Sequence, residues 1–345
     1  MDSGQRSILI IYTGGTIGMV QNPVNGTLQP FNFDQISQQV PELQKFGFSL
    51  ETISFDPPLD SSDIGPDLWV RMAEIVYQNY HHYDGFVILH GTDTMAYSAS
   101  ALSFILENLA KPVIFTGSQL PIGILRTDGK ENILTAIEIA AATEDGRPIV
   151  PEVCIYFENR LYRGNRTTKI NADNFNAFQS ANYPPLGKVG IKIKYNREAI
   201  LFPKDNRTLK IHTVFDNHIG ILKLFPGMNR EFIDSILGIK GLKGVILETF
   251  GSGNAPADEW FVKRIRRAIE NGIIVLDVTQ CSIGSVSLGA YETSRKLYEA
   301  GVISGYDITT EAATTKMMLL FGQNLSTDEI KLHLNSSLRG EITIT

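Results

Sequence analysis

The sequence predicts a two-domain α/β protein, with a larger N-terminal domain on a doubly wound, mainly parallel sheet and a smaller C-terminal α/β domain. Two patterns predict this fold class. Short β-branched runs are apolar throughout instead of alternating, which is typical of strands covered on both faces. Longer amphipathic patterns separate these runs, as helical crossovers separate parallel strands. The chain has 345 residues, more than one hydrophobic core usually holds, so we expect two domains.

Strands and helices are expected in alternation along the chain. Helices are expected where apolar residues recur with a period near 3.6, and Gly272 is the expected stop of the fourth. The expected strands are residues 7–12, 85–90, 112–118, 152–157, 219–225, 244–250 and 272–278, and the expected helices are residues 67–80, 95–109, 131–143, 258–272 and 292–301.

The helical pattern breaks between about Gly187 and Asp216, where short alternating runs are separated by polar turns. Such a segment is typical of a connection between two domains. We therefore expect an N-terminal domain over residues 1–190, a linker region over residues 191–215 and a C-terminal domain over residues 216–345.

The composition argues against several classes of partner. The formal net charge is −6 and the lysines and arginines are scattered, so the chain has no basic footprint for nucleic acid or an anionic membrane. No run approaches the roughly 18 apolar residues that a membrane-spanning helix needs. We expect a soluble, cytoplasmic protein.

Cysteine and histidine usage points away from thiol and metal chemistry. Cys154 and Cys281 lie in or at the end of strand-like runs, and we expect two buried free thiols. The six histidines form no metal-ligand spacing with cysteines or carboxylates. We expect neither a catalytic cysteine nor a metal or other cofactor.

The stretch "YTGGTIG" follows the first expected strand, and in an open α/β sheet ligands bind beyond the carboxyl ends of the strands. Gly14 and Gly15 permit a tight turn, but neither a phosphate-loop Lys-Ser/Thr nor the G-x-G-x-x-G spacing is present. The stretch therefore predicts no phosphate site. On its own, a threonine after such a turn is more often a helix cap.

The stretch "HGTDT" ends the second expected strand and leaves Thr92, Asp93 and Thr94 in a turn before a helix. One of the three can cap that helix. The remaining hydroxyl and carboxylate are then expected in the same crevice as Thr13 and Thr16.

Two further stretches leave a structural and a functional alternative open. "RGNRTTK" is basic, which most often indicates a solvated loop, although Lys169 held near a threonine and an aspartate could move a proton. "DSSD", residues 60–63, precedes a helix and could simply cap it.

Taken together, "YTGGTIG", "DSSD", "HGTDTMAYSASAL", "FTGSQLP" and "RGNRTTK" closely resemble the bacterial L-asparaginase family, in its cytoplasmic type I branch. The resemblance covers almost the whole chain and extends through "GSGNAP", "VTQC", "GVISGYDIT" and "LRGEIT". It implies a hydrolase that converts L-asparagine to L-aspartate and ammonia, with weaker activity on glutamine. A nucleotide-binding protein and a non-catalytic amino-acid-binding protein remain the alternatives.

By this resemblance, Thr16 matches the nucleophile that forms an acyl-enzyme with the substrate. Thr92, Asp93 and Lys169 match the second threonine triad, in which the lysine makes Thr92 a better proton acceptor. Asp93 also matches the partner of the substrate's ammonium group. Backbone N–H groups of the Gly15 and Thr92 turns are the expected oxyanion donors.

The resemblance also implies substrate-binding residues. Asp60, Ser61 and Ser62 match the loop that holds the substrate's α-carboxylate. Ser118 matches the position whose backbone carbonyl receives the amide nitrogen. Asn254 matches a C-terminal-domain position bordering the amino end of the substrate.

One departure concerns a catalytic tyrosine that many relatives carry in the loop after the first threonine motif. Here that loop, "MVQNPVNGTLQPF", has none, so either Thr27 or a tyrosine from elsewhere takes its place. Our candidate is Tyr291, in a segment that in this family often reaches a neighbouring subunit's site. We therefore expect a homodimer or a dimer of dimers; a second, regulatory asparagine site near Glu248 and Cys281 stays open.

Overall fold

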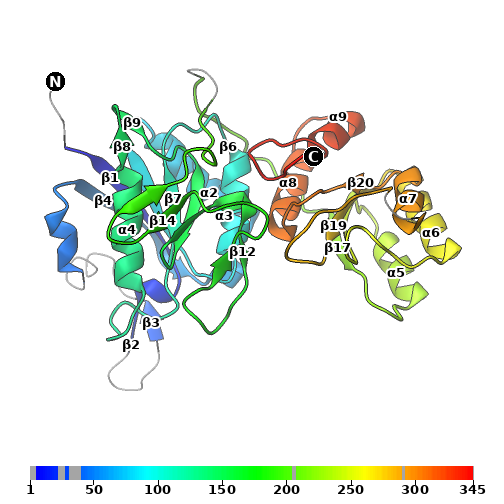
Figure 1. Ribbon diagram of the computed structural model, residues 1–345, viewed down its shortest axis with the longest axis horizontal. Helices are drawn as coiled ribbons and strands as arrows, with labels where there is room; N and C mark the ends of the chain where they lie inside the picture. The colour runs from blue at the N-terminus through cyan, green and yellow to red at the C-terminus, as the bar shows by residue number, and fades with distance from the viewer. Residues whose placement is uncertain (1–4, 22–27, 31–39, 204–206, 290–291, 345) are drawn as a thin grey trace. The chain divides into compact units, whose positions relative to one another are not determined.

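A mixed eight-stranded sheet organises the first of the two units into which the computed structural model divides, Met1–His212 and Thr213–Thr345 (Figure 1). The structure describes residues 5–21, 28–30, 40–203, 207–289 and 292–344. The strands are, in spatial order, β15 (Ile193–Tyr195), β14 (Gly187–Val189), β11 (Arg160–Arg163), β10 (Val153–Phe157), β7 (Val113–Thr116), β5 (Gly85–Leu89), β1 (Ser7–Gly14) and β4 (Ser49–Leu59).

The strands from β4 to β10 run parallel, whereas β11, β14 and β15 continue the sheet antiparallel. The expected mainly parallel sheet is confirmed. Strand β4 was not expected from the sequence, because it forms the edge of the sheet and only Phe55 of its side chains is buried. Strands β14, β15 and β16 (Lys210–Ile211) lie in the segment where the helical pattern breaks, and all three pair with strands of the first unit.

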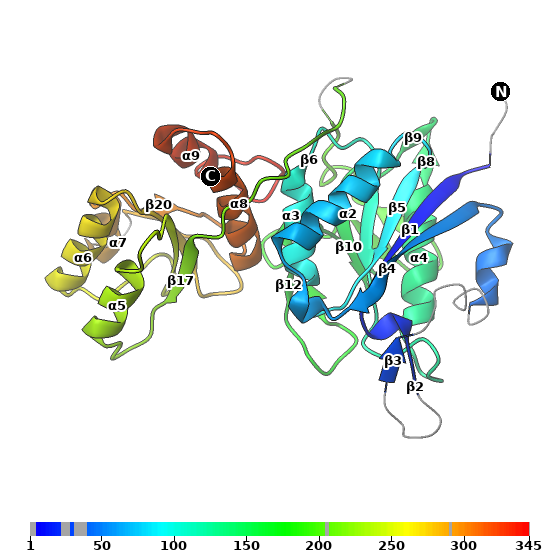
Figure 2. The same cartoon turned by 180° about the vertical axis from the view of Figure 1, so that it is seen from behind.

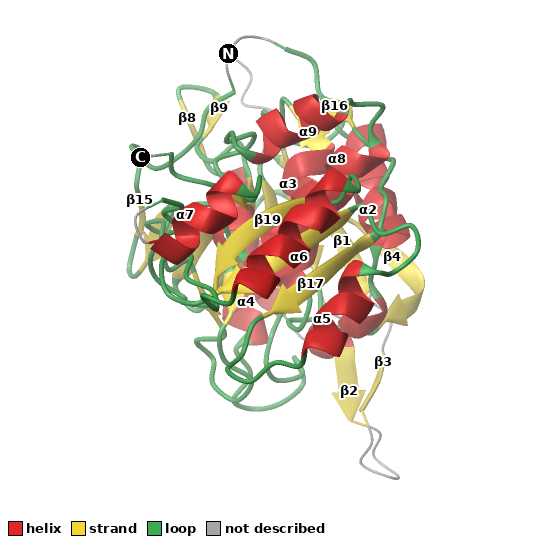
Figure 3. Cartoon of the chain, turned by 90° about the vertical axis from the view of Figure 1, so that its right-hand side faces the viewer, coloured by secondary structure: helices red, strands yellow, loops and turns green. Residues whose placement is uncertain are grey.

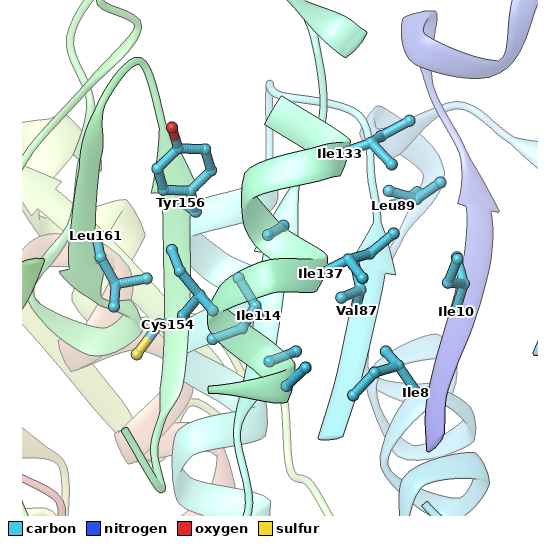
Figure 4. Packing of buried hydrophobic residues seen from close by; sticks show 14 of the residues in the cluster. Ile8, Ile10, Val87, Leu89, Ile114, Ile133, Ile137, Cys154, Tyr156 and Leu161 are labelled. Carbon is cyan, nitrogen blue, oxygen red and sulfur yellow. The ribbon is translucent and has the colours of Figure 1, made fainter. Parts of the chain in front are cut away.

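Helices cover both faces of this sheet. Helix α4 (Gly129–Ala141) packs on one face, and α2 (Pro66–Gln78) and α3 (Met95–Ile105) lie on the other (Figures 1 and 2). Ile133 and Ile137 of α4 pack against alternate residues of the strands, among them Ile10 and Val87 (Figure 4). Each is almost fully buried, which is worth about 1.5–3 kcal/mol per side chain. Helix α3 is shorter than expected because β6 (Leu106–Glu107) leaves it to pair with β16.

The second unit is built on a four-stranded parallel sheet of β17 (Ile219–Lys223), β18 (Gly244–Thr249), β19 (Ile274–Thr279) and β20 (Ile303–Ser304). One face carries α5 (Arg230–Leu237), α6 (Glu259–Glu270) and α7 (Glu292–Glu299) (Figure 3). Helix α8 (Thr310–Gly322), with α9 (Thr327–Leu334) beside it, contacts the sheet as well. Helices α5, α8 and α9 were not among the expected elements.

A buried ion pair ties the C-terminal segment to α8. Lys316 Nζ lies 2.6 Å from Glu341 Oε1, and neither side chain is exposed to solvent. Backbone N–H groups of Leu338 and Arg339 also donate to the Glu341 carboxylate, at 2.7–3.0 Å. These hydrogen bonds and the lysine keep the pKa of Glu341 low despite its burial. With these partners the Glu341 carboxylate can stay ionised in the protein interior.

The two cysteines differ in environment. Cys154 is buried in β10, as expected, but Cys281 is exposed just beyond β19, so the expectation of two buried thiols was wrong. The short run that contains Cys281 ends in a surface turn instead of continuing the strand. Among the described residues, no helix combines the length and apolar character needed to cross a membrane.

A buried carboxyl lies in the second half of β19. Asp277 is fully buried, and its Oδ1 accepts a hydrogen bond of 2.7 Å from Thr249 Oγ1. Burial raises the pKa of Asp277 to about 7. The protonated form is therefore favoured in the folded protein at acidic pH, whereas the unfolded chain ionises near pH 4.

Asp277→Asn should make stability less dependent on pH. The wild-type cost of burying the ionised carboxyl is absent below about pH 4, grows with pH, and is complete above about pH 7, where it reaches on the order of 4 kcal/mol. Urea unfolding should show a stability gain from the substitution about 3 kcal/mol larger at pH 8 than at pH 5. Glu270→Gln, at an exposed position of α6, is the control; an equal gain from Asp277→Asn at both pH values would contradict the assignment.

Candidate active site

The candidate site lies where the chain leaves the carboxyl ends of β1 and β5. These strands are neighbours and parallel, with Tyr12 opposite Leu89. After β1 the chain leads to Val40 and Leu43, which pack on the same face of the sheet as α4. After β5 it enters α3, which lies on the opposite face. Two connections that diverge in this way leave a crevice between them.

Gly15 allows the turns after β1 and β5 to come into contact. Gly15 has a φ of 86°, and a Cβ there would lie 2.5 Å from the backbone nitrogen of Gly91. Such an approach is open only to a residue without a side chain. Thr16 follows as the half-buried first residue of the turn η1 (Thr16–Gly18). The contact therefore places the Thr16 turn against the turn that carries Thr92.

Thr13 does not face the crevice, so that expectation was wrong. Its side chain is fully buried, and its hydroxyl donates a 2.9 Å hydrogen bond to the carbonyl of Leu89. The bond ties the ends of the two strands together. The N–H of Gly15 is also engaged, because it donates to the carbonyl of Leu59 at 3.2 Å. An oxyanion would have to be bound by other N–H groups of these turns.

Lys169 joins the two polar side chains of the second turn. Its Nζ lies 2.8 Å from Thr92 Oγ1 and 2.7 Å from Asp93 Oδ1. The Lys169 side chain is 17% exposed and that of Asp93 69%, so the carboxylate is open to solvent while the ammonium is largely covered. Lys169 is positioned by β12 (Thr168–Lys169), which pairs with β13 (Phe178–Gln179). The fold thus assembles three of the sequence-predicted site residues.

Gln119 is a member of this group that the sequence analysis did not single out. Thr92 Oγ1 donates to its Oε1 at 3.2 Å. The residue stands beside Ser118 in "FTGSQLP". The sequence did contain a signal for Gln119: it is a polar residue directly after the expected strand 112–118. The carboxyl ends of neighbouring parallel strands meet at one edge of the sheet, where ligands bind.

The loop after β4 lies against the same turn. The carbonyl of Ser61 accepts a 2.6 Å hydrogen bond from Thr94 Oγ1, and a Cβ on Gly91 would meet the Ser61 hydroxyl at 2.6 Å. Asp60 caps η4 (Ser61–Asp63): its Oδ1 accepts from the N–H of Ser62 at 2.9 Å and from its hydroxyl at 2.8 Å. These bonds hold the pKa of Asp60 below its usual value. Asp60 therefore does cap a helical turn, as the structural alternative expected, and its loop also lies next to the candidate site.

The basic segment before Lys169 is not a solvated loop. Arg163 and Arg166 are almost fully buried, and both guanidinium groups lie over the ring of Tyr183. Arg163 Nε donates to the Glu152 carboxylate at 2.6 Å. A paired, stacked arginine can be held in a protein interior. The segment is therefore a rigid support that leads into Lys169.

His90 and Ser118 are buried in the turns that follow β5 and β7. Burial lowers the pKa of His90 to about 4, so its ring is neutral, and Nδ1 lies 2.7 Å from the carbonyl of Gly91. Only a protonated Nδ1 can bond to a carbonyl, which fixes the tautomer. The Ser118 hydroxyl donates to the carbonyl of Leu120 at 2.6 Å. The contact expected between the Ser118 backbone carbonyl and the amide nitrogen of a substrate stays a prediction.

The remaining predicted residues are Asn254, Tyr291 and Thr27. Asn254 is in the second unit, where its backbone exchanges two 2.8 Å hydrogen bonds with Phe250 to close the turn after β18. Tyr291 and Thr27 lie outside the described residues. Within the part of the chain that the structure describes, no three His, Cys, Asp or Glu side chains form a group that could hold a metal ion.

Comparisons with known proteins cover nearly the whole chain. The family models "Asparaginase, N-terminal" and "Glutaminase/Asparaginase C-terminal domain" match residues 7–201 and 218–333. L-asparaginase 1 of Escherichia coli K12 is 44% identical over 98% of each chain. The crystal structure of L-asparaginase I from Vibrio cholerae is 42% identical, with a TM-score of 0.90 over 99% of this chain and 100% of that one. The 60 kDa lysophospholipase of Mus musculus is 40% identical over 99% of this chain but only 63% of its own length.

Gly15→Ala should destabilise the fold by about 2 kcal/mol or more, because the new Cβ meets the Gly91 backbone and the residue must keep a positive φ. Gly190→Ala is the control, since a Cβ there meets nothing within 4 Å. Chemical denaturation measures both. A Gly15→Ala protein as stable as the Gly190→Ala protein would show that the two turns are not in contact.

Proposed function

Because this chain belongs to the L-asparaginase family of amidohydrolases, we propose that it hydrolyses L-asparagine to L-aspartate and ammonia with Thr16 as the nucleophile. The observation that carries the proposal is the sharing of Lys169 Nζ between Thr92 and Asp93, beside the turn of Thr16. A pure binding protein has no need of two hydroxyls and a lysine arranged for proton transfer.

In the proposed reaction the Thr16 hydroxyl attacks the side-chain amide carbon of asparagine. The hydroxyl proton leaves as the C–O bond forms, and the amide nitrogen, once protonated, departs as ammonia. Water then attacks the acyl-enzyme and releases aspartate and the Thr16 hydroxyl. A threonine hydroxyl is a weak nucleophile without a proton acceptor, and Thr92 with Lys169 supplies one.

The charged ends of the substrate have candidate partners next to this centre. The solvent-exposed carboxylate of Asp93 suits the α-ammonium group. The loop of Asp60, Ser61 and Ser62 suits the α-carboxylate through its hydroxyl and N–H groups. His90 supports the oxyanion site, since it holds the Gly91 carbonyl on one side of the peptide and so directs the Thr92 N–H to the other.

The hydroxyl and lysine groups supply the nucleophile and the proton transfer, so the proposed reaction requires no metal or cofactor. We place the enzyme in the cytoplasm, as the resemblance to the type I branch implies. We further propose a homodimer or a dimer of dimers in which the C-terminal unit of a second subunit, with Asn254 and Tyr291, completes each site.

Thr16→Ala and Thr92→Val should each reduce kcat on asparagine by at least about 10³-fold, because each removes a hydroxyl that acts in the chemical steps. Ammonia release from the purified protein measures this, with wild type assayed before and after exhaustive chelation. Thermal unfolding checks that both variants remain folded. Near-native kcat in either variant would remove that residue from the mechanism, and loss of wild-type activity on chelation would refute a cofactor-free reaction.

Glutamine should be hydrolysed with a kcat/KM about 10-fold or more below that of asparagine. Clamping both charged ends of the substrate fixes the distance to the scissile amide, and glutamine is one methylene longer. Steady-state kinetics on both amides at one pH give the ratio. Equal values would be incompatible with the two-ended clamp.

Asparagine hydrolysis should be restored when subunits of two inactive variants are combined in one oligomer. Thr16→Ala and Tyr291→Ala subunits are mixed, dissociated and reassociated, and hybrids are isolated by differential tagging. If Tyr291 serves a neighbouring subunit's site, some hybrid sites carry both native residues and activity returns. Verified hybrids without activity would exclude Tyr291 from a shared site.

A further inference from the structure

Thr94 stands at the start of α3 but does not cap the helix. It occupies the N-cap position, and its side chain makes no capping hydrogen bond. A threonine at this position normally stabilises its own helix by accepting from a backbone N–H. Here Thr94 Oγ1 donates at 2.6 Å to the carbonyl of Ser61. The hydroxyl therefore ties the start of α3 to the loop after β4.

This loop contacts both turns of the candidate site. The carbonyl of Leu59, the last residue of β4, accepts from the N–H of Gly15 at 3.2 Å, which joins the start of the loop to the turn after β1. A Cβ on Gly91 would meet Ser61 Oγ at 2.6 Å, so Ser61 lies directly against the turn after β5. The hydrogen bond from Thr94 holds Ser61 at this second contact.

The Ser61 hydroxyl suits a ligand. Ser61 is 3% exposed, and within the described part of the chain its hydroxyl has no hydrogen-bond partner. Buried hydroxyls are normally hydrogen-bonded. The neighbouring Ser62 hydroxyl already donates to Asp60 Oδ1, at 2.8 Å. Ser61 therefore carries the hydroxyl of this loop that is left for the α-carboxylate of the substrate.

Thr94 also follows Asp93 directly in the chain. Asp93 is the proposed partner of the α-ammonium group, and Ser61 belongs to the proposed partner of the α-carboxylate. Both charged groups of an α-amino acid are attached to one carbon atom, so their two partners must lie at a fixed separation to bind one molecule. The hydrogen bond from Thr94 to Ser61 spans this separation.

We propose that Thr94 is a positioning residue for the α-amino-acid group of the substrate: it holds Ser61 at the distance from Asp93 at which one molecule reaches both. The inference rests on the proposed function, in which these two residues bind the charged ends of asparagine. Thr94 acts through Ser61 and takes no part in the proton transfer assigned to Thr92 and Lys169. Its loss therefore weakens the binding of substrate and transition state alike.

The first test is Thr94→Val, which removes the hydroxyl and keeps the shape of the side chain. KM for asparagine should rise about 5- to 10-fold, the scale of one hydrogen bond, with kcat changed less than about twofold. Thr94→Ser keeps a hydroxyl and should restore most of the affinity. Thr314→Val is the matched control, since Thr314 Oγ1 also donates to a backbone carbonyl, that of Thr310 within α8, at 2.7 Å; its KM should match wild type.

Ser61→Ala gives an independent variant for the same inference. It removes the hydroxyl that Thr94 positions and should also raise KM for asparagine. In this background Thr94→Val should raise KM less than about twofold further, because the group that it holds in place is gone. Thermal unfolding checks that each variant remains folded.

The second test uses two analogues of asparagine as competitive inhibitors of its hydrolysis. Succinamate has the carboxylate without the ammonium group, and β-alaninamide has the ammonium group without the carboxylate. Thr94→Val should raise the inhibition constant of succinamate by about the same factor as KM. It should leave that of β-alaninamide within about twofold of wild type, because only the carboxylate is bound through Ser61. A general loosening of the site would weaken both inhibitors equally.

The outcomes separate the inference from the proposed function. Wild type that releases no ammonia from asparagine would refute the proposed function itself. If wild type is active, an unchanged KM in folded Thr94→Val, or a Thr94→Ser protein as impaired as Thr94→Val, would overturn the positioning role. Equal weakening of succinamate and β-alaninamide, or a full effect of Thr94→Val in the Ser61→Ala background, would overturn it as well.

Discussion

The contact between Gly15 and Gly91 is the constraint on which the site depends. Adjacent parallel strands bring their carboxyl ends to within one strand spacing, but turns with side chains would hold the following segments apart. Because Gly15 has no Cβ, its backbone can lie against that of Gly91, and Thr16 lies beside the turn of Thr92. The proposed nucleophile and the proposed proton-transfer group are then neighbours although they are far apart in the sequence.

Around this contact, buried polar groups hold the turns in a single arrangement. Thr13 ties the end of β1 to Leu89, and neutral His90 holds the Gly91 carbonyl. Each of these hydrogen bonds lies in the interior, where an unmade bond would cost about 1–3 kcal/mol. The site is therefore preorganised by the fold, as the proposed reaction through a transient oxyanion requires.

Much of the fold and part of the site could be predicted from the sequence, for physical reasons that also explain the failures. The buried parallel strands were predictable because both of their faces are covered, whereas the edge strand β4 is mostly exposed and has no apolar run. Helix α8 is buried on most sides and so lacks an amphipathic period. The proximity of Thr92 and Lys169 was expected from their motifs, but Gln119 was missed because no sequence pattern marks its hydrogen bonds to Thr92 and to the carbonyl of Asn174. The burial of Arg163 was missed because local composition does not show that Glu152 lies opposite.

The Lys316–Glu341 pair has a consequence for how this chain tolerates shortening. Terminal residues of most domains can be removed or fused with little harm because they carry few contacts. Here a chain cut just before Glu341 would leave an ammonium group enclosed in the second unit with no counter-charge, and a loss on the order of 3–5 kcal/mol is expected for such an orphaned ion. The segment that contains Glu341 is thus an integral part of the second unit's interior. A tag or fusion partner should therefore be added after this segment and should not replace it.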